Sequence, residues 1–156
     1  ASMGAHRTTA PWRGGRGAAA AMAAALHDAG LDPDDVDYVC AHGTGTKRND
    51  PAETLAIRRV FGAHADRLAV SALKGALGHV LAGAGAVAFA ACALAVQRDV
   101  VPPTANLAEP DPACDLDYVP GRCRRQTVRA AINNAFAFGG QNSCLVLRKA
   151  EPGRTP

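Results

Sequence analysis

One segment without any charged residue limits what this chain of 156 residues can fold into. Residues 80–96 are apolar or glycine throughout, and eight of them are alanine, which favours helix. Pro102 and Pro103 prevent continuation, so we expect a helix over about residues 79–97. The segment is short and weakly apolar for a membrane span, so its composition favours a helix packed inside a protein.

The rest of the sequence alternates further helices with short strands. We expect a helix over residues 18–29, ended by Gly30, and another over 51–61, with Asp50 as its N-cap and Pro51 in its first turn. The expected strands cover residues 36–41, 68–71, 129–135 and 142–148. A loop is expected at 74–78, and an irregular stretch from the two prolines to residue 120. A glycine turn at 136–141 joins the last two strands as an antiparallel pair. This alternation predicts an α/β layer fold in a single domain.

Charge and aromatic content narrow the possible partners. The net charge is only +3, and the basic clusters at residues 47–48, 58–59 and 122–129 are typical of a solvated surface; contact with an acidic carrier protein is the alternative. Aromatic residues make up 4% of the chain and do not alternate with the basic ones, which argues against nucleic-acid binding.

The cysteines and the chain ends bear on compartment and domain limits. The cysteines are Cys40, Cys92, Cys114, Cys123 and Cys144, and they form no CxxC pair. An odd number without a recognisable signal peptide indicates reduced thiols in the cytoplasm. We expect no metal site, because no ligand spacing recurs. The chain begins with alanine, which indicates either a cloning remnant or a piece of a longer protein. We interpret residues 1–17 as a loop or linker, 18–149 as the domain, and 150–156 as a flexible tail.

Three stretches carry candidate chemistry, and the first is CAHGTGTKRND at residues 40–50. Two glycines at the end of a strand allow unusual backbone angles and the close approach of a ligand. The hydroxyls of Thr44 and Thr46 could bind an amide-bearing substrate arm, and His42 could present a neutral imidazole to a reacting group. Viewed alone, the stretch is equally a glycine-rich turn with a structural histidine.

The second and third stretches are SALKGALGH at 71–79 and NNAFAFGGQN at 133–142. A histidine that opens the long helix would be kept neutral by the helix N-terminus and could stabilise an oxyanion, with Lys74 in support. Two phenylalanines before a double glycine could form a mobile gate at a pocket mouth. The alternatives are a surface lysine with an N-terminal histidine, and a hairpin turn with two core phenylalanines.

Together and in this order, the three stretches resemble the C-terminal half of a β-ketoacyl-acyl-carrier-protein synthase, the ketosynthase of fatty acid and polyketide assembly. The family pattern is an HGTxT loop, a KxxxGH segment and an NxFGFGGxN turn, which DYVCAHGTGT, VSALKGALGH and NNAFAFGGQN match. The resemblance covers residues 9–149. It implies an α/β fold, the C-terminal half of a thiolase-like αβαβα layered block, with a mixed sheet and helices on its faces.

The resemblance also implies roles for individual residues. His42 and His79 are similar to the catalytic pair that polarises the malonyl thioester carbonyl, and Lys74 to the lysine that orders them. The expected substrate-binding residues are Thr44, Thr46, Phe136, Phe138, Gly139 and Gly140, and the expected supporting residues are Asp50, Glu53 and Asn142. No metal or redox cofactor is implied, because phosphopantetheine arrives on the acyl carrier protein. The chain departs from the family at two positions. Ala72 stands where the family often has a serine, and Ala137 stands where it has a glycine, so the added methyl group could stiffen the gate.

The resemblance leaves one catalytic group unaccounted for. The family nucleophile is a cysteine in a Thr-Ala-Cys context in the N-terminal half, and this chain has no such segment. We therefore expect an acyltransferase half that is inactive alone, exposes one side of its long helix, and pairs with an N-terminal ketosynthase half or a second copy. Acyl carrier protein is the expected substrate partner, and no membrane partner is expected. A non-catalytic subunit like the chain-length factors is the alternative, although both histidines and the lysine are retained.

Overall fold

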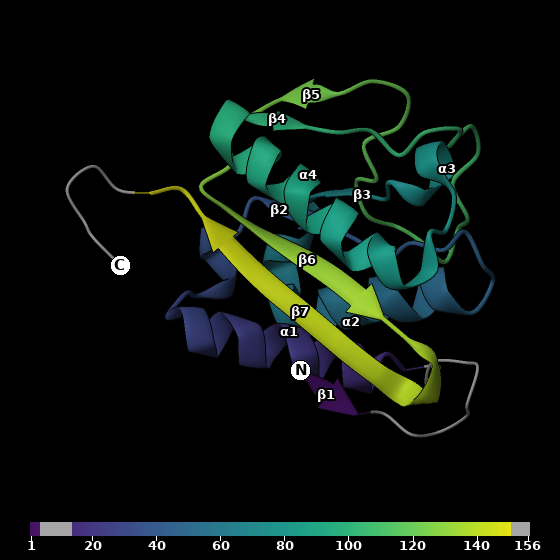
Figure 1. Ribbon diagram of the computed structural model, residues 1–156, viewed down its shortest axis with the longest axis horizontal. Helices are drawn as coiled ribbons and strands as arrows, with labels where there is room; N and C mark the ends of the chain where they lie inside the picture. Colours follow the sequence, from purple (N-terminus) through teal and green to yellow (C-terminus); the bar gives the residue numbers. More distant parts are fainter. Residues whose placement is uncertain (4–13, 151–156) are drawn as a thin grey trace.

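The computed structural model describes residues 1–3 and 14–150, and in it a mixed sheet lies between helices on both faces (Figure 1). The sheet has the order β1-β7-β6-β2-β3. Its strands are β1 (Ser2–Met3), β2 (Tyr38–Cys40), β3 (Ala69–Ser71), β6 (Ala130–Phe136) and β7 (Gln141–Arg148). Helices α1 (Arg16–Ala29) and α2 (Asn49–Phe61) cover one face, and α4 (Ala84–Arg98) covers the other.

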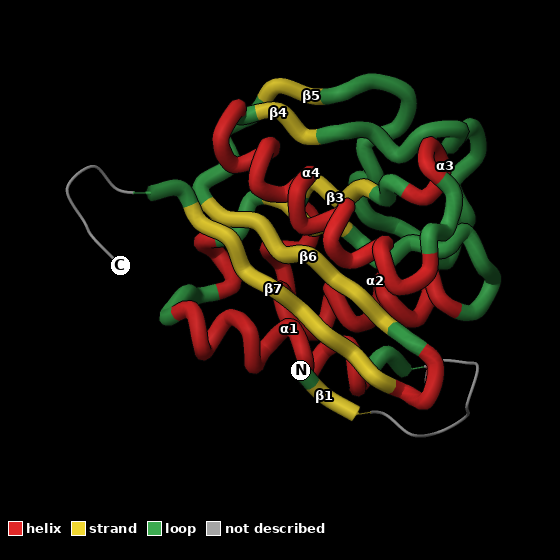
Figure 2. The backbone as a smooth tube through the Cα atoms, in the orientation of Figure 1, coloured by secondary structure: helices red, strands yellow, loops and turns green. Residues whose placement is uncertain are grey.

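The register of the strands brings the three motifs to the same end of the sheet. Strand β2 runs parallel to both β3 and β6, and Cys40 lies level with Ser71 on one side and Asn133 on the other. The segments that follow β2 and β3 therefore leave the sheet at the same end, and β6 continues beside them to Phe136. Strands β6 and β7 form the expected antiparallel hairpin (Figure 2).

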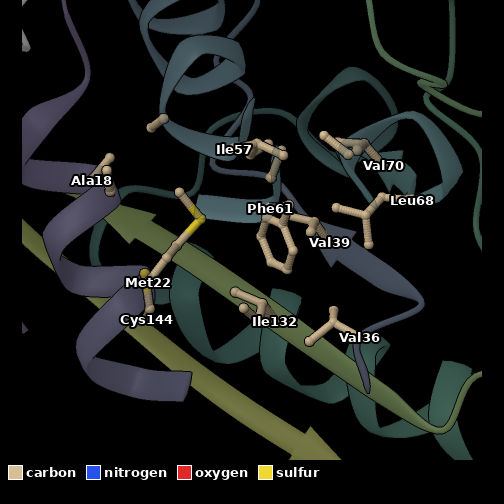
Figure 3. Close-up of a cluster of buried hydrophobic side chains, with 14 of the residues drawn as sticks. Ala18, Met22, Val36, Val39, Ile57, Phe61, Leu68, Val70, Ile132 and Cys144 are labelled. Atoms are coloured by element: carbon tan, nitrogen blue, oxygen red, sulfur yellow. The ribbon is translucent and has the colours of Figure 1, made fainter. Parts of the chain in front are cut away.

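The core between α1, α2 and the sheet is built from medium-sized apolar side chains. Figure 3 shows Met22 of α1 and Phe61 of α2 clustered with Val39 and Ile132 of the strands, all of them buried. Each such side chain contributes about 1.5–3 kcal/mol on burial. The alanines of α1 that face the sheet are also buried, so this helix lies close to β7. Gly30 ends α1 in a left-handed conformation, as predicted.

Helix α4 is buried on one side only. Ala88, Cys92 and Ala95 face the sheet, whereas Phe89 and Leu94 on the opposite side remain 41% and 47% exposed. This confirms the expectation of one bare side. Residues 81–98 have a mean hydropathy of 1.5 and are long and apolar enough to cross a membrane by length and composition alone, a test that the core helix of a soluble protein also passes. The segment therefore meets a span criterion that we expected it to miss.

The segment around His79 differs from the prediction. Residues expected to form a loop are a short helix, α3 (Lys74–Leu77), and the long helix begins at Ala84 rather than at residue 79. Between them lies a 3-10 turn, η3 (Leu81–Gly83). Gly78 and Leu81 have φ angles of 75° and 49°, which a continuous α-helix does not accommodate. These two residues separate α3 from α4 and place His79 in a connecting segment.

Smaller differences occur elsewhere. Within residues 1–17, interpreted as loop, Ser2 and Met3 pair with β7 and α1 begins at Arg16; residues 4–13 lie outside the described part of the chain. Helix α2 begins at Asn49, so Asp50 is not its N-cap. Two short strands were not predicted: β4 (Val100–Val101), just before the irregular stretch, pairs with β5 (Arg124–Arg125), just after it. The remaining 3-10 turns are η1 (Pro33–Asp35), η2 (Gly62–Arg67) and η4 (Phe138–Gly140).

Candidate functional site

The loop that follows β2 is held from below by one carboxylate. Glu53 of α2 accepts the backbone N–H of His42 at 2.8 Å and that of Gly43 at 2.9 Å, one on each carboxylate oxygen. Gly43 has a φ of 43°, and a Cβ added there would lie 2.3 Å from the Cβ of Ala72. Only glycine therefore lets the loop pass this close to the segment after β3. The geometry puts the His42 side chain at the sheet edge, 8% exposed.

Two amide side chains complete the surroundings of Glu53. Asn49 donates to its Oε2 at 3.3 Å, and Asn134 donates to its Oε1 at 3.0 Å. Burial raises the pKa of the Glu53 carboxyl, and all four hydrogen bonds oppose that rise because each stabilises the ionised form. The four polar groups bonded to the carboxyl are all donors, so a proton on it would meet no acceptor among them. The site is therefore built for a carboxylate.

The His42 imidazole is held in its neutral form with a defined tautomer. Its Nδ1 accepts the backbone N–H of Phe136 at 3.3 Å, which leaves the ring proton on Nε2. Burial, followed by the neighbouring Lys74 and His79, lowers the pKa of His42 to about 3. At neutral pH this residue is therefore a hydrogen-bond donor through Nε2, and the Phe136 ring lies beside it with a centroid distance of 5.3 Å.

Lys74, the first residue of α3, lies on the other side of His42. Its ammonium donates to the backbone carbonyl of His42 and lies 3.5 Å from the imidazole Nδ1. Burial lowers the pKa of Lys74, while the negative charges of Glu53 and Asp50 act in the opposite direction. The backbone of His42 is thus bound at its N–H by an anion and at its carbonyl by a cation.

His79 faces His42 across the site. The two rings are 5.8 Å apart and nearly perpendicular, with an interplanar angle of 82°. The Nδ1 of His79 accepts the backbone N–H of Leu81 at 3.1 Å, so the neutral ring also carries its proton on Nε2. The explanation that a helix N-terminus keeps this ring neutral is wrong, because α4 begins only at Ala84. His79 is exposed in this chain, unlike His42.

The other predicted residues lie around the two histidines or support their loops. The hydroxyls of Thr44 and Thr46 are 2.9 Å apart, and Thr46 accepts the N–H of Asn49, which is the capping role predicted for Asp50. Asp50 instead accepts from the Asn49 side chain at 3.0 Å. Asn142 donates to the carbonyl of Gly140 at 2.9 Å.

The glycine turn of the third motif presents one aromatic ring to solvent. Phe138 is 70% exposed, whereas Phe136 packs beside His42. Gly139 and Gly140 have φ angles of 76° and 77°, so both are in the left-handed region that glycine favours. Ala137 is extended, with a φ of −132°, and its methyl group therefore causes no backbone strain.

Several residues that support the site are not among those predicted from the sequence. Asn134 is one of them, although it lies within the third motif. Thr104 accepts the N–H of Ala72 at 3.1 Å, and Asn106 donates to the carbonyl of Gly75 at 2.9 Å, so the segment after Pro102-Pro103 supports the lysine-bearing helix. Threonine and asparagine beside prolines are a common turn signal, which does not reveal a distant partner.

The described residues contain no thiol suited to act as the nucleophile of this site. Cys40, Cys92, Cys114 and Cys144 are buried, and burial raises the pKa of Cys144 to about 12. Cys123 is exposed, but it lies near the wrong end of α4. It precedes β5, and β5 pairs with β4 just after the C-terminal end of that helix (Figure 1), whereas His79 precedes its N-terminal end. Among the described residues, no group of three or more His, Cys, Asp or Glu could hold a metal ion.

Known structures share this fold. The ishigamide ketosynthase/chain length factor matches with a TM-score of 0.91 and 41% identity, over 96% of this chain and 36% of that one. A type II polyketide acyl carrier protein in complex with its ketosynthase matches with a TM-score of 0.93 and 35% identity, again over 96% of this chain and 36% of the other. The fold is thus the C-terminal half of a thiolase-like αβαβα block, as predicted.

Sequence comparison identifies the family. The model of the "Beta-ketoacyl synthase, C-terminal domain" matches residues 1–108. 3-Oxoacyl-[acyl-carrier-protein] synthase 2 of Synechocystis sp. is 50% identical over 93% of this chain and 35% of its own length, and nodulation protein E of a Rhizobium sp. is 53% identical over 85% of this chain and 33% of its own length. The chain belongs to the beta-ketoacyl synthase family, and it spans about a third of the length of these curated relatives.

Proposed function

We propose that this chain is the C-terminal half of a ketosynthase that catalyses decarboxylative Claisen condensation of an acyl thioester with malonyl carrier protein. The observation that supports this most strongly is the pair of imidazoles 5.8 Å apart, each with its Nδ1 bonded to a backbone N–H. In its neutral form, each ring can donate only through Nε2. Two such donors suit an oxygen on which negative charge develops.

The chemistry follows from that pair. The malonyl thioester carbonyl oxygen accepts hydrogen bonds from His42 and His79. Loss of CO₂ leaves the electron pair of the broken C–C bond on the enolate, whose oxygen the two N–H groups stabilise. The enolate carbon then attacks an acyl group held as a thioester on a cysteine, and the cysteine leaves as a thiolate. The low pKa of His42, about 3, keeps this donor neutral throughout.

The remaining predicted residues take supporting or binding roles in this proposal. Lys74 and Glu53 hold the His42 backbone from its two sides. Asp50 and Asn142 orient the α2 N-terminus and the glycine turn. The phosphopantetheine arm of the carrier protein would pass the predicted substrate-binding residues, which are Thr44, Thr46, Phe136, Phe138, Gly139 and Gly140. No metal or redox cofactor takes part in the proposal.

The nucleophilic cysteine would come from elsewhere. We propose that this chain alone is inactive and that the bare side of α4 is covered by an N-terminal ketosynthase half or by a second copy. Leu77, Val80 and Leu81, which are close to His79 in the sequence, are exposed as well. Burying such a surface stabilises by roughly 25 cal/mol per Å², which is a strong drive to associate. The proposed location is the cytoplasm, in keeping with five unpaired cysteines.

Sedimentation of the purified chain at micromolar concentration tests the association. We expect oligomers, and we expect Phe89→Glu with Leu94→Glu to shift the population toward monomer. Leu55→Glu is the matched control, because Leu55 is also about half exposed but lies on α2, on the other face of the sheet. A monodisperse monomer of the unaltered chain would contradict the proposal.

A non-catalytic subunit like a chain-length factor is the second candidate. It is favoured by the matched structures, two of which are described as a ketosynthase with its chain length factor. The retention of His42, Lys74 and His79 in bonding geometry argues for the catalytic role, because a scaffold has no use for two polarising imidazoles.

The deciding experiment combines composition with activity. The protein is purified from its own gene, its polypeptides are separated under denaturing conditions, and their intact masses are measured. We expect a longer chain, or a second polypeptide, that carries a Thr-Ala-Cys segment, and malonyl decarboxylation that falls at least about 100-fold in His42→Ala and His79→Ala. Decarboxylation that survives both substitutions would contradict the catalytic proposal and favour the scaffold.

A further inference from the structure

We infer that Asn134 is a positioning residue of this site, held in its donating orientation by the sulfur atoms of Met22 and Cys144. Asn134 lies on β6, level with Cys144 of β7, and its side chain points toward α1 and α2. It is 2% exposed, Met22 is fully buried, and Cys144 is 6% exposed. The amide is therefore enclosed by partners from three different elements.

The two sulfurs differ in what they can do, and this difference orients the amide. The Asn134 Nδ2 lies 3.5 Å from the Met22 thioether, which can only accept a hydrogen bond. The Cys144 thiol lies 3.0 Å from the Asn134 Oδ1 and can donate to it. Burial keeps that thiol protonated. A flipped amide would place its oxygen against an acceptor-only sulfur and lose the thiol donor.

The orientation of the amide determines the state of Glu53. With Nδ2 toward Oε1 at 3.0 Å, Asn134 stabilises the carboxylate. With Oδ1 there instead, the carboxyl would need a proton to satisfy that contact. A protonated Glu53 would accept less strongly from the N–H groups of His42 and Gly43, which are the bonds that hold the catalytic loop. Asn134 therefore acts on His42 through Glu53 and does not touch the substrate.

Asparagine-to-aspartate substitution tests the contact between Asn134 and Glu53. Asn134→Asp preserves size but brings a second carboxyl to within about 3 Å of Glu53, and two carboxyls at that distance share one proton. At about pH 5 the shared proton replaces the lost N–H bond. At about pH 8 both groups ionise and repel, so the His42 loop should detach. The other titratable groups around Glu53 are Lys74, Asp50, Cys40, Tyr118, Cys144 and His42.

The readout is the folding equilibrium of the purified full protein, measured by denaturant titration at both pH values and compared with the unaltered protein. We expect the folding equilibrium constant of Asn134→Asp to fall at least about tenfold from pH 5 to pH 8 relative to the parent. Asn106→Asp is the matched control, because Asn106 is exposed and the one hydrogen bond described for its side chain runs to the carbonyl of Gly75, so its relative value should not change. Equal pH responses of the two variants would overturn the inference.

The sulfur atoms have their own test. Titration of the Glu53 carboxyl by ¹³C NMR should show a higher pKa in Met22→Leu combined with Cys144→Val, where the two sulfurs no longer help to hold the amide in its donating orientation. Cys144→Ser alone keeps a donor and should titrate like the parent. An unchanged titration in the double variant would remove the sulfurs from the inference.

The catalytic consequence rests on the proposed function, but the two tests above do not. In a complete enzyme, decarboxylation by Asn134→Asp should decline from pH 5 to pH 8 relative to the parent. If the folding response is present and no decarboxylation is found in any assembly, the proposed function fails and the positioning role stands. If the folding response is absent, the positioning role fails even in an active enzyme.

Discussion

The two histidines of this site belong to regions that are built very differently. His42 is 8% exposed, and its backbone is bonded to Glu53 and Lys74 while its ring is bonded to Phe136. His79 is exposed, and the one hydrogen bond described for its ring runs to Leu81, two residues away. The first is positioned by contacts between three distant segments, and the second mainly by its own turn.

The difference indicates which part of the site this chain completes by itself. The His42 loop is enclosed by β2, α2 and β6, so its geometry depends on the core of this chain. The His79 segment connects helices α3 and α4. Leu77, at the end of α3, and Val80 and Leu81, in the connecting segment, face solvent. The position of the His79 ring is therefore expected to become better defined when those residues are covered. Four predictions test this contrast, from the largest expected effect to the smallest.

Removal of the Glu53 carboxylate should cause the largest loss. Glu53→Ala leaves two backbone N–H groups and two side-chain amides of the His42 region without their acceptor. Buried donors without a partner cost about 1–3 kcal/mol each, so we expect the free energy of unfolding to fall by at least about 3 kcal/mol in urea titration. The exposed Glu109 provides the control, with an expected change within about 0.5 kcal/mol. A loss under about 1 kcal/mol for Glu53→Ala would contradict the anchoring role.

Substitution of Gly43 should have the next largest effect. Gly43→Ala combines a positive φ with a methyl group 2.3 Å from the Cβ of Ala72, and we expect a loss of about 2 kcal/mol or more. Gly45→Ala is the matched control in the same loop, since its φ is 70° and its added Cβ would meet nothing within 4 Å. That change should cost only about 1 kcal/mol. Equal losses for the two variants would mean that close packing against Ala72 is not what constrains the loop.

The depressed pKa of His42 predicts how stability depends on pH. The folded pKa of about 3 lies below the ordinary value of 6.5, so between these pH values the unfolded chain binds the extra proton. The contribution of His42 to stability is therefore complete above about pH 6.5 and declines as the pH falls toward 3, by at most about 1.4 kcal/mol per pH unit. Denaturant titrations should show this slope reduced in His42→Gln. An identical slope in that variant would exclude His42 as its source.

Substitution of His79 should have the smallest effect. His79→Ala removes an exposed ring with a local hydrogen bond, and we expect a change within about 0.5 kcal/mol in the free energy of unfolding. His42→Ala in the same titration should lose about 2 kcal/mol, because it opens a cavity beside Phe136 and Lys74. Similar losses for both variants would show that the two regions are equally ordered, which contradicts the contrast drawn above.

Much of the layer structure could be predicted because it depends on local signals. Alanine content and Gly30 predicted α1 nearly to the residue, and the pattern around the third motif predicted the β6–β7 hairpin. The break in the long helix was missed, because an uncharged alanine-rich segment reads as continuous helix and a left-handed Leu81 has no sequence signal. The role of Asn134 could not be predicted for a related reason. Its partners lie on other elements, α1, α2 and β7, and two of them, Met22 and Glu53, are distant in sequence.

The sequence by itself determined the chemistry available to this protein and the family in which that chemistry is used. His42, Lys74 and His79 stand in motifs that can be recognised without coordinates, because their order and neighbours are specific. Only the tertiary structure decided which ring nitrogens are left to donate a hydrogen bond. The parallel register of β2, β3 and β6 brings the motifs to one sheet edge, and backbone N–H groups of Phe136 and Leu81 occupy both Nδ1 atoms. A tautomer depends on hydrogen-bond partners that are distant in sequence, so it arises only when the chain is folded.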